Sequence, residues 1–440
     1  MEFCNLHSIH KSEILPGVSL TCINTDKFKS GCITVSMLSK LDREKAAANA
    51  LLPRVLRRGS ANLPDMESIS AALDDLYGVR IEPVIRKKGE VHCIGFYADF
   101  PDDRYIPGGE SVLEKAVVIV GDILLDPYMY EGNLCSDYTE SEKSNLIDDI
   151  RAAINDKRGY AIDRLLEEMC KDEAFGVGKL GSEDSAQKIT NIILTKHYYE
   201  LIENSRIEIF YCGSADPERV KKVVESTFKG LPERRNAEIP ETEIIYSPPG
   251  DQPRRFKEEL DVSQGKMTIG FRMGNTMKAP DYPALMLFNA LYGGSVSSKL
   301  FLNVRERLSL CYYASSMIDK HKGIMLVSSG LDISNFDIAF DEIIAQLEEV
   351  KNGNISDWEL TSAKRSIITS IKSAFDRPGG LEELYFDSVI YTFHYDPVKL
   401  SDMIEATTLE RVVSVASGIK TDSIYLLSGL EGKEADDEIN

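Results

Sequence analysis

Histidine and cysteine are the residue types that could hold a metal ion or act as a nucleophile, and their spacing in this chain favours neither chemistry. Only His7 and His10 lie close together, and no pair is spaced as H-x-x-x-H. No two cysteines form C-x-x-C, and none lies near a histidine at a zinc-finger spacing. G-x-S-x-G and Walker-type phosphate-loop motifs are absent as well. The histidines and cysteines are His7, His10, His92, His197, His321, His394, Cys4, Cys22, Cys32, Cys93, Cys135, Cys170, Cys212 and Cys311.

The net charge limits the classes of partner that the protein can bind. The formal net charge is −20, which argues against a nucleic-acid surface because phosphate binding needs a clustered basic field. The ordinary explanation of this acidity is solubility; a preference for basic or unfolded peptides is the second. No apolar run approaches the length of a membrane span, and the N-terminal segment has no apolar core typical of a secretory signal. Cys93 and Cys212 lie in strand-like segments, where cysteines are usually small buried hydrophobes, and this favours a reduced, cytoplasmic protein.

The length of 440 residues predicts at least two domains. Residues 232–256 are rich in proline and charge and read as a linker between halves. We therefore expect domain 1 over 1–231 and domain 2 over 257–430. Residues 431–440 read as an acidic tail.

The two halves show the same order of patterns. Each opens with strand-like alternation, GCITVSML in the first and KMTIGFRM in the second, and then continues with a helical stretch. Both end on a long charged helix, in which Lys143 aligns with Lys364 and, after one gap, Asp156 with Asp376. This predicts a duplicated α+β domain with a mostly antiparallel sheet packed against helices. The alternative is generic helix–strand alternation in two unrelated α/β domains.

A known family is visible in two blocks. Residues 291–313, LYGGSVSSKLFLNVRERLSLCYY, resemble the second-domain signature of the pitrilysin/insulinase zinc metallopeptidases, which include mitochondrial processing peptidase. Residues 211–232, YCGSADPERVKKVVESTFKGLP, resemble the strand and helix that close domain 1 of that family. The resemblance implies two similar domains per chain and a chamber that holds a peptide. It also implies zinc bound by an H-x-x-E-H helix and a distal glutamate, with the motif glutamate as general base.

The sequence departs from this pattern at the metal. Ala50 and Arg54 stand where the two histidines belong, and Pro53 stands where the general base belongs. Alanine has no donor atom, arginine stays charged and proline cannot take a proton, so all three roles are lost together. The distal ligand position falls near Glu142, which is otherwise read as a solvated helix residue. We expect no cofactor in this chain and zinc only in a partner subunit.

Arg305 and Tyr312 are the residues that the resemblance marks for substrate binding. In family members an arginine and a tyrosine at this spacing reach the active site of a facing domain and stabilise the tetrahedral intermediate. The structural alternative is an arginine that caps a helix and a tyrosine packed in a sheet. Gly293 and Gly294 match a glycine-rich loop that handles substrate in non-catalytic processing-peptidase subunits; a plain turn before a helix is the alternative.

A further likeness points to a subgroup. The run RVLRRGS, followed by Leu76, Tyr77 and Gly78, resembles bacterial members without a metal site. Such members occur beside an active relative and are associated with modification of elongation factor P. Arg54, Arg57 and Arg58 fit a contact with a partner or an acidic substrate, or simply a solvated helix face.

Three functions follow from these patterns. The first is a non-catalytic subunit that forms a heterodimer with an active H-x-x-E-H zinc peptidase and binds a peptide or protein substrate with it. The second is a homodimeric peptide-binding or scaffold protein with no proteolytic role. The third, least favoured by the residues, is a zinc peptidase with an unorthodox site.

Overall fold

The computed structural model describes residues 8–234, 237–391 and 396–430, so the acidic tail, Cys4, His7 and His394 lie outside the described residues. Two compact units make up the chain, and each is discontinuous in sequence. Unit 1 comprises 8–151, 177–234, 237–241 and 373–391; unit 2 comprises 152–176, 242–372 and 396–430. The units differ from the contiguous ranges 1–231 and 257–430 because each half of the chain contributes one helical segment to the other unit.

Unit 1 is built on a six-stranded sheet in the order β1-β2-β8-β3-β5-β4. Its strands pair antiparallel, apart from the parallel pair β2–β8. A two-stranded hairpin, β6–β7, lies outside this sheet. The strands are β1 (Ser8–Leu15), β2 (Val18–Asn24), β3 (Ser30–Lys40), β4 (Arg80–Lys88), β5 (Val91–Pro101), β6 (Met129–Tyr130), β7 (Asn133–Leu134) and β8 (Arg206–Gly213).

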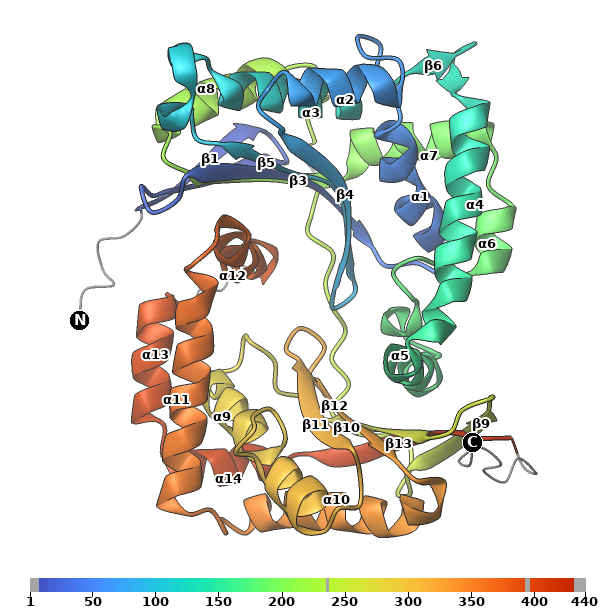
Figure 1. Ribbon diagram of the computed structural model, residues 1–440, viewed down its shortest axis with the longest axis vertical. Coiled ribbons are helices and arrows are strands. Elements are labelled where there is room, and N and C mark those ends of the chain that lie inside the picture. Colours follow the sequence, from blue (N-terminus) through green and yellow to red (C-terminus); the bar gives the residue numbers. More distant parts are fainter. Residues whose placement is uncertain (1–7, 235–236, 392–395, 431–440) are drawn as a thin grey trace, which may run out of the picture. The chain divides into compact units, whose positions relative to one another are not determined.

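The helices of unit 1 divide between the two faces of the sheet (Figure 1). Strand residues such as Val35 and Phe96 pack with Ala50 and Val117 in one large core on the helical face. The opposite face carries α12, which contacts β3 and β8. The helices are α1 (Ala46–Leu56), α2 (Met66–Asp74), α3 (Val112–Leu125), α4 (Ser136–Ala152), α6 (Glu183–Gln187), α7 (Asn191–Asn204), α8 (Pro217–Phe228) and α12 (Pro378–Tyr391), with 3-10 turns η1 (Asp103–Tyr105) and η2 (Pro107–Gly109).

Unit 2 is built on a five-stranded sheet in the order β11-β12-β10-β13-β9. Helix α5 packs on one face of this sheet, and α9, α10 and α14 pack together (Figure 1). The strands are β9 (Arg254–Glu259), β10 (Gly265–Arg272), β11 (Tyr313–Asp319), β12 (Ile324–Leu331) and β13 (Lys420–Ser428). The helices are α5 (Lys157–Met169), α9 (Tyr282–Tyr292), α10 (Phe336–Lys351), α11 (Asp357–Ala374), α13 (Pro397–Ala406) and α14 (Leu409–Ser417), with short turns η3 (Ala153–Asn155), η4 (Ala174–Gly176) and η6 (Ile333–Asn335) and the π-helix η5 (Leu300–Arg307).

The two sheets share one connectivity. The order β2-β8-β3-β5-β4 in unit 1 matches β9-β13-β10-β12-β11 in unit 2. The parallel pair β2–β8 also has its counterpart in β9–β13. The prediction of duplicated α+β domains with mostly antiparallel sheets is confirmed. No helix within the described ranges is both long and apolar enough to cross a bilayer.

Candidate functional site

Helix α1 carries the three positions at which the sequence departs from the metal motif. Ala50 is fully buried and packs in the unit 1 core. Pro53 lies inside the helix, which nevertheless continues to Leu56, and Arg57 donates its backbone N–H to the Pro53 carbonyl. The proline denies the Asn49 carbonyl its usual N–H donor one turn later. The helix is held by its buried apolar face, to which Ala46, Leu51 and Val55 belong.

Two arginines of α1 and its C-terminal turn pair with carboxylates of α4. The Arg54 Nη1 lies 2.7 Å from the Asp149 Oδ2, and the Arg58 Nη1 lies 3.1 Å from the Glu142 Oε1. Asp149 is the carboxylate that the structure brings to the second histidine position, and the sequence analysis did not single it out. The sequence could have indicated Asp149, because it lies seven residues after Glu142 and therefore on the same face of α4.

The residues at this place do not fit a zinc ion. Ala50 offers a methyl group, Pro53 a closed ring and Arg54 a cation that already neutralises Asp149. Glu142 is likewise held by Arg58. Within the described part of the chain, no group of three or more His, Cys, Asp or Glu side chains is placed to bind a metal. The Arg54 guanidinium thus neutralises a carboxylate of α4.

The residue before Ala50 joins a buried polar trio. The Asn49 Nδ2 donates to the His92 Nδ1 on β5 at 3.1 Å, and the His197 Nε2 on α7 donates to the Asn49 Oδ1 at 2.7 Å. Burial lowers the pKa of each histidine to about 4; nearby lysines add to the effect for both. Both rings are therefore neutral at pH 7, and the side chain that links them is the amide of Asn49.

Arg305 lies on the π-helix η5, a rare form that is frequent at functional sites. Its guanidinium stacks over the Phe301 ring at 4.8 Å and lies 3.5 Å from the Glu306 carboxylate. The helix ends near Ser309, a non-glycine residue with φ of 51°. Such local strain persists only where the surroundings impose it, and it clusters at binding sites.

Tyr312 follows this turn and is 52% exposed. Its hydroxyl donates to the Asp332 Oδ1 at 3.1 Å, and this hydrogen bond raises the tyrosine pKa. Gly293 and Gly294 form the turn after α9, where both backbone N–H groups donate to the Asn289 carbonyl. A Cβ at Gly293 would lie 2.6 Å from the Ser316 nitrogen, so close packing against β11 requires glycine there.

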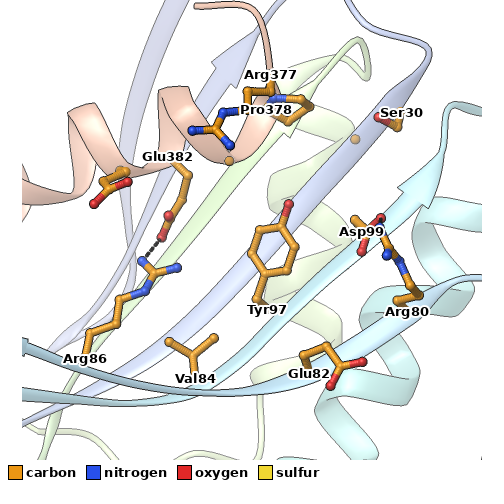
Figure 2. Close-up of a pocket in the computed structure, with 13 residues that line it drawn as sticks. Ser30, Arg80, Glu82, Val84, Arg86, Tyr97, Asp99, Arg377, Pro378 and Glu382 are labelled. Atoms are coloured by element: carbon orange, nitrogen blue, oxygen red, sulfur yellow. Dashed lines mark hydrogen bonds and ion pairs between the residues drawn. The ribbon is translucent and has the colours of Figure 1, made fainter. Parts of the chain in front are cut away.

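A cavity of about 560 Å³ lies on the face of the unit 1 sheet that carries α12 (Figure 2). Figure 2 shows Tyr97 between two ion pairs, Arg86–Glu382 and Arg80–Asp99, each with an N···O distance of 2.6 Å. Glu382 is almost fully buried, and its pair with Arg86 fastens the start of α12 to β4. The residues that line this cavity include no histidine, cysteine or lysine, so it lacks the usual nucleophile–base pairs built on those side chains.

Comparison with known proteins identifies the chain. The family described as the peptidase M16 inactive domain matches residues 188–367. The probable inactive metalloprotease YmfF of Bacillus subtilis (strain 168) is 32% identical over 416 residues, which cover 94% of this chain and 97% of that protein. This chain belongs to the M16 peptidase family. The resemblance drawn from residues 291–313 and 211–232 is confirmed.

Solved structures agree on the fold. A conserved protein of Enterococcus faecalis V583 superimposes with a TM-score of 0.89 at 24% identity, over 97% of this chain and 100% of that chain. A peptidase M16 inactive domain of Pseudomonas fluorescens gives a TM-score of 0.78 at 13% identity, over 97% and 99%. Together with the family match, this makes the chain an M16 peptidase-like protein of the inactive type.

Proposed function

We propose that this M16 chain is a non-catalytic subunit that assembles with a zinc-bearing H-x-x-E-H relative. It completes the peptide-binding chamber and contributes Arg305 and Tyr312 to the partner's site. One contrast carries the proposal. The metal positions are filled by a methyl group, a proline ring and an ion pair between Arg54 and Asp149, whereas Arg305 and Tyr312 stay open to solvent beside a strained turn.

The chemistry proposed for this pair is electrostatic. A guanidinium and a phenol hydroxyl are hydrogen-bond donors suited to the negative oxygen that develops when water attacks a peptide carbonyl. Phe301 stacks under Arg305 and orients its guanidinium before substrate arrives. The Tyr312 hydroxyl donates its one proton to Asp332, so it donates to a substrate oxygen only after that hydrogen bond breaks. Neither donor needs a metal in its own chain, which is why an inactive chain can supply both in trans.

The proposal places the protein in the cytoplasm. Within the described ranges, Cys22, Cys32, Cys93, Cys135, Cys212 and Cys311 form no disulfide, and five of these six are buried. Buried unpaired thiols are typical of a reducing compartment. Self-association into a homodimeric scaffold is the competing outcome, and the experiment below separates the two.

The test mixes this chain with a zinc-bearing M16 relative from the same organism and follows cleavage of a fluorogenic peptide. We expect turnover to rise at least tenfold over either chain alone, with co-elution at the mass of a heterodimer. Arg305→Ala is expected to lower kcat of the mixture by about 10²-fold, the usual loss for one oxyanion donor. Arg307→Ala is the matched control, because that exposed side chain on the same π-helix lies 3.8 Å from Glu342.

Two results would count against the proposal. A stable homodimer that leaves the relative's turnover unchanged would favour the scaffold reading. If both Arg305→Ala and Tyr312→Ala still stimulate turnover as wild type does, the complex forms but these two residues do not act in the partner's site.

A further inference from the structure

The outer edge of the unit 1 sheet lies beside the helix that carries the degenerate metal positions. Among the strands of the described ranges, β4 is the last of its sheet and has β5 as its one neighbour. Helix α1 contacts both strands. An open edge strand presents unpaired N–H and C=O groups and is a template for an extended peptide. The accessibility of these groups therefore decides whether a peptide backbone can pair with this chain.

Pro83 removes one of the outward groups. It lies inside β4, opposite Phe96 of β5. Proline has no backbone N–H, so within a sheet it occupies edge positions whose nitrogen points away from the neighbouring strand. The outer edge of β4 consequently lacks a donor at residue 83.

Arg57 occupies a second outward group. Its Nε donates to the Ile81 carbonyl at 2.7 Å, although Ile81 is itself a β4 residue opposite Ala98. Alternate residues of an antiparallel strand direct their polar groups to the same side, so residues 81 and 83 share the outer edge. The acceptor at residue 81 and the donor at residue 83 are thus both unavailable to a peptide that pairs with the first half of β4.

In unit 2 a backbone carbonyl occupies one outward group of the corresponding edge strand. Strand β11 ends that sheet, and its Ser316 N–H donates to the Gly293 carbonyl at 3.0 Å. Gly293 follows α9 as Arg57 follows α1, so in both units the residue after the equivalent helix bonds the equivalent edge strand. A side chain makes this contact in unit 1 and a backbone carbonyl makes it in unit 2. The recurrence of the contact at equivalent positions argues against chance packing.

We propose that the β4 edge of this chain is closed to an extended peptide by Pro83 and Arg57. Substrate backbone therefore does not add a strand to the unit 1 sheet at this edge. The closure depends only on residues of this chain and does not require a partner. Its consequence, that in the complex the peptide backbone pairs with the partner while this chain supplies side-chain donors, rests on the proposed function.

The test uses the full chain without any partner, so its outcome does not depend on whether the complex exists. The probe is a fluorescein-labelled peptide of about ten residues with alternating threonine and valine, capped by lysines. A second copy carries N-methyl groups at alternate residues, which abolish strand pairing but keep the side chains. Binding is read by fluorescence anisotropy, with amide hydrogen exchange of β4 as the site readout.

Wild type is expected to bind both peptides equally weakly. The double variant Arg57→Ala/Pro83→Val restores the missing donor and frees the Ile81 carbonyl. It should bind the unmethylated peptide at least tenfold more tightly than wild type, with new protection in β4. Arg58→Ala is the control, since it removes a neighbouring guanidinium that pairs with Glu142 and not with β4.

Preferential binding of the unmethylated peptide by wild type, with protection in β4, would overturn the proposal without any variant. So would a double variant that keeps the wild-type circular dichroism spectrum and Tm but gains no affinity, because closure would then not be what excludes the peptide.

Discussion

Acidification from pH 7 to pH 5 is expected to destabilise unit 1 through His92 and His197. Both have a folded-state pKa of about 4, against 6.5 for an unperturbed histidine. The unfolded chain therefore binds more protons between these values. Stability is fully present above pH 6.5, falls as the pH drops through this window and levels off below pH 4. Each histidine is expected to remove about 2 kcal/mol at pH 5 and about 3 kcal/mol by pH 4.

The physical reason is the trio around Asn49. Because the Asn49 amide nitrogen can only donate, the His92 Nδ1 must accept, and a proton there would set two donors against each other in the core. Urea unfolding at pH 7 and pH 5 measures the loss. His197→Gln keeps a donor for the Asn49 Oδ1 but does not titrate, so it should lose about half as much. His10→Gln, at an exposed position of β1, is the control. Equal acid sensitivity in wild type and His197→Gln would contradict this assignment.

Glu173→Gln is expected to lower the free energy of unfolding of unit 2 by about 4 kcal/mol, because it breaks a buried ion network. The Glu173 Oε2 lies 2.7 Å from the Lys322 Nζ, and both Glu173 oxygens accept from Arg272, which also pairs with Asp422 at 2.8 Å. Burial opposes ionisation of Glu173, but Arg272 and Lys322 lower its pKa overall. Glutamine would leave Lys322, whose side chain is fully buried, without this carboxylate.

Native-state hydrogen exchange of the β10 and β12 amides measures the change. Glu167→Gln is the matched control: it removes the same charge from the same segment of the chain at an exposed pair with Arg164. It should cost less than 1 kcal/mol. A loss of under 1 kcal/mol for Glu173→Gln would show that this ion network does not hold residues 152–176 to unit 2.

Local patterns predicted much of the architecture. Alternation in GCITVSML and KMTIGFRM marked β3 and β10, which occupy the same place in their sheets. Side-chain chemistry at Ala50, Pro53 and Arg54 could be judged from the letters, because no fold gives a methyl group a lone pair. The placement of Arg305, Tyr312, Gly293 and Gly294 at a substrate site stays a prediction.

Features that depend on register could not be predicted. Asn49 meets His92 and His197 only because β5 and α7 pack against α1, and nothing in the sequence around His197 reports this. The sequence also gives no sign that residues 152–176 belong to unit 2 and residues 373–391 to unit 1. An amphipathic pattern shows that a helix has an apolar face, but not which sheet that face packs against. The sequence shows Arg57 only as one member of a basic cluster, and its hydrogen bond to the Ile81 carbonyl depends on how α1 packs against β4.

Zinc content and peptide turnover of the isolated chain test the central claim most directly. The chain is purified in metal-free buffer, dialysed against micromolar zinc and measured by elemental analysis and with the fluorogenic peptide. Because Ala50, Pro53 and Arg54 stand at the expected ligand and base positions, we expect the chain to bind no stoichiometric zinc and to show no peptide turnover. One zinc per chain, with turnover that a chelator abolishes, would contradict it.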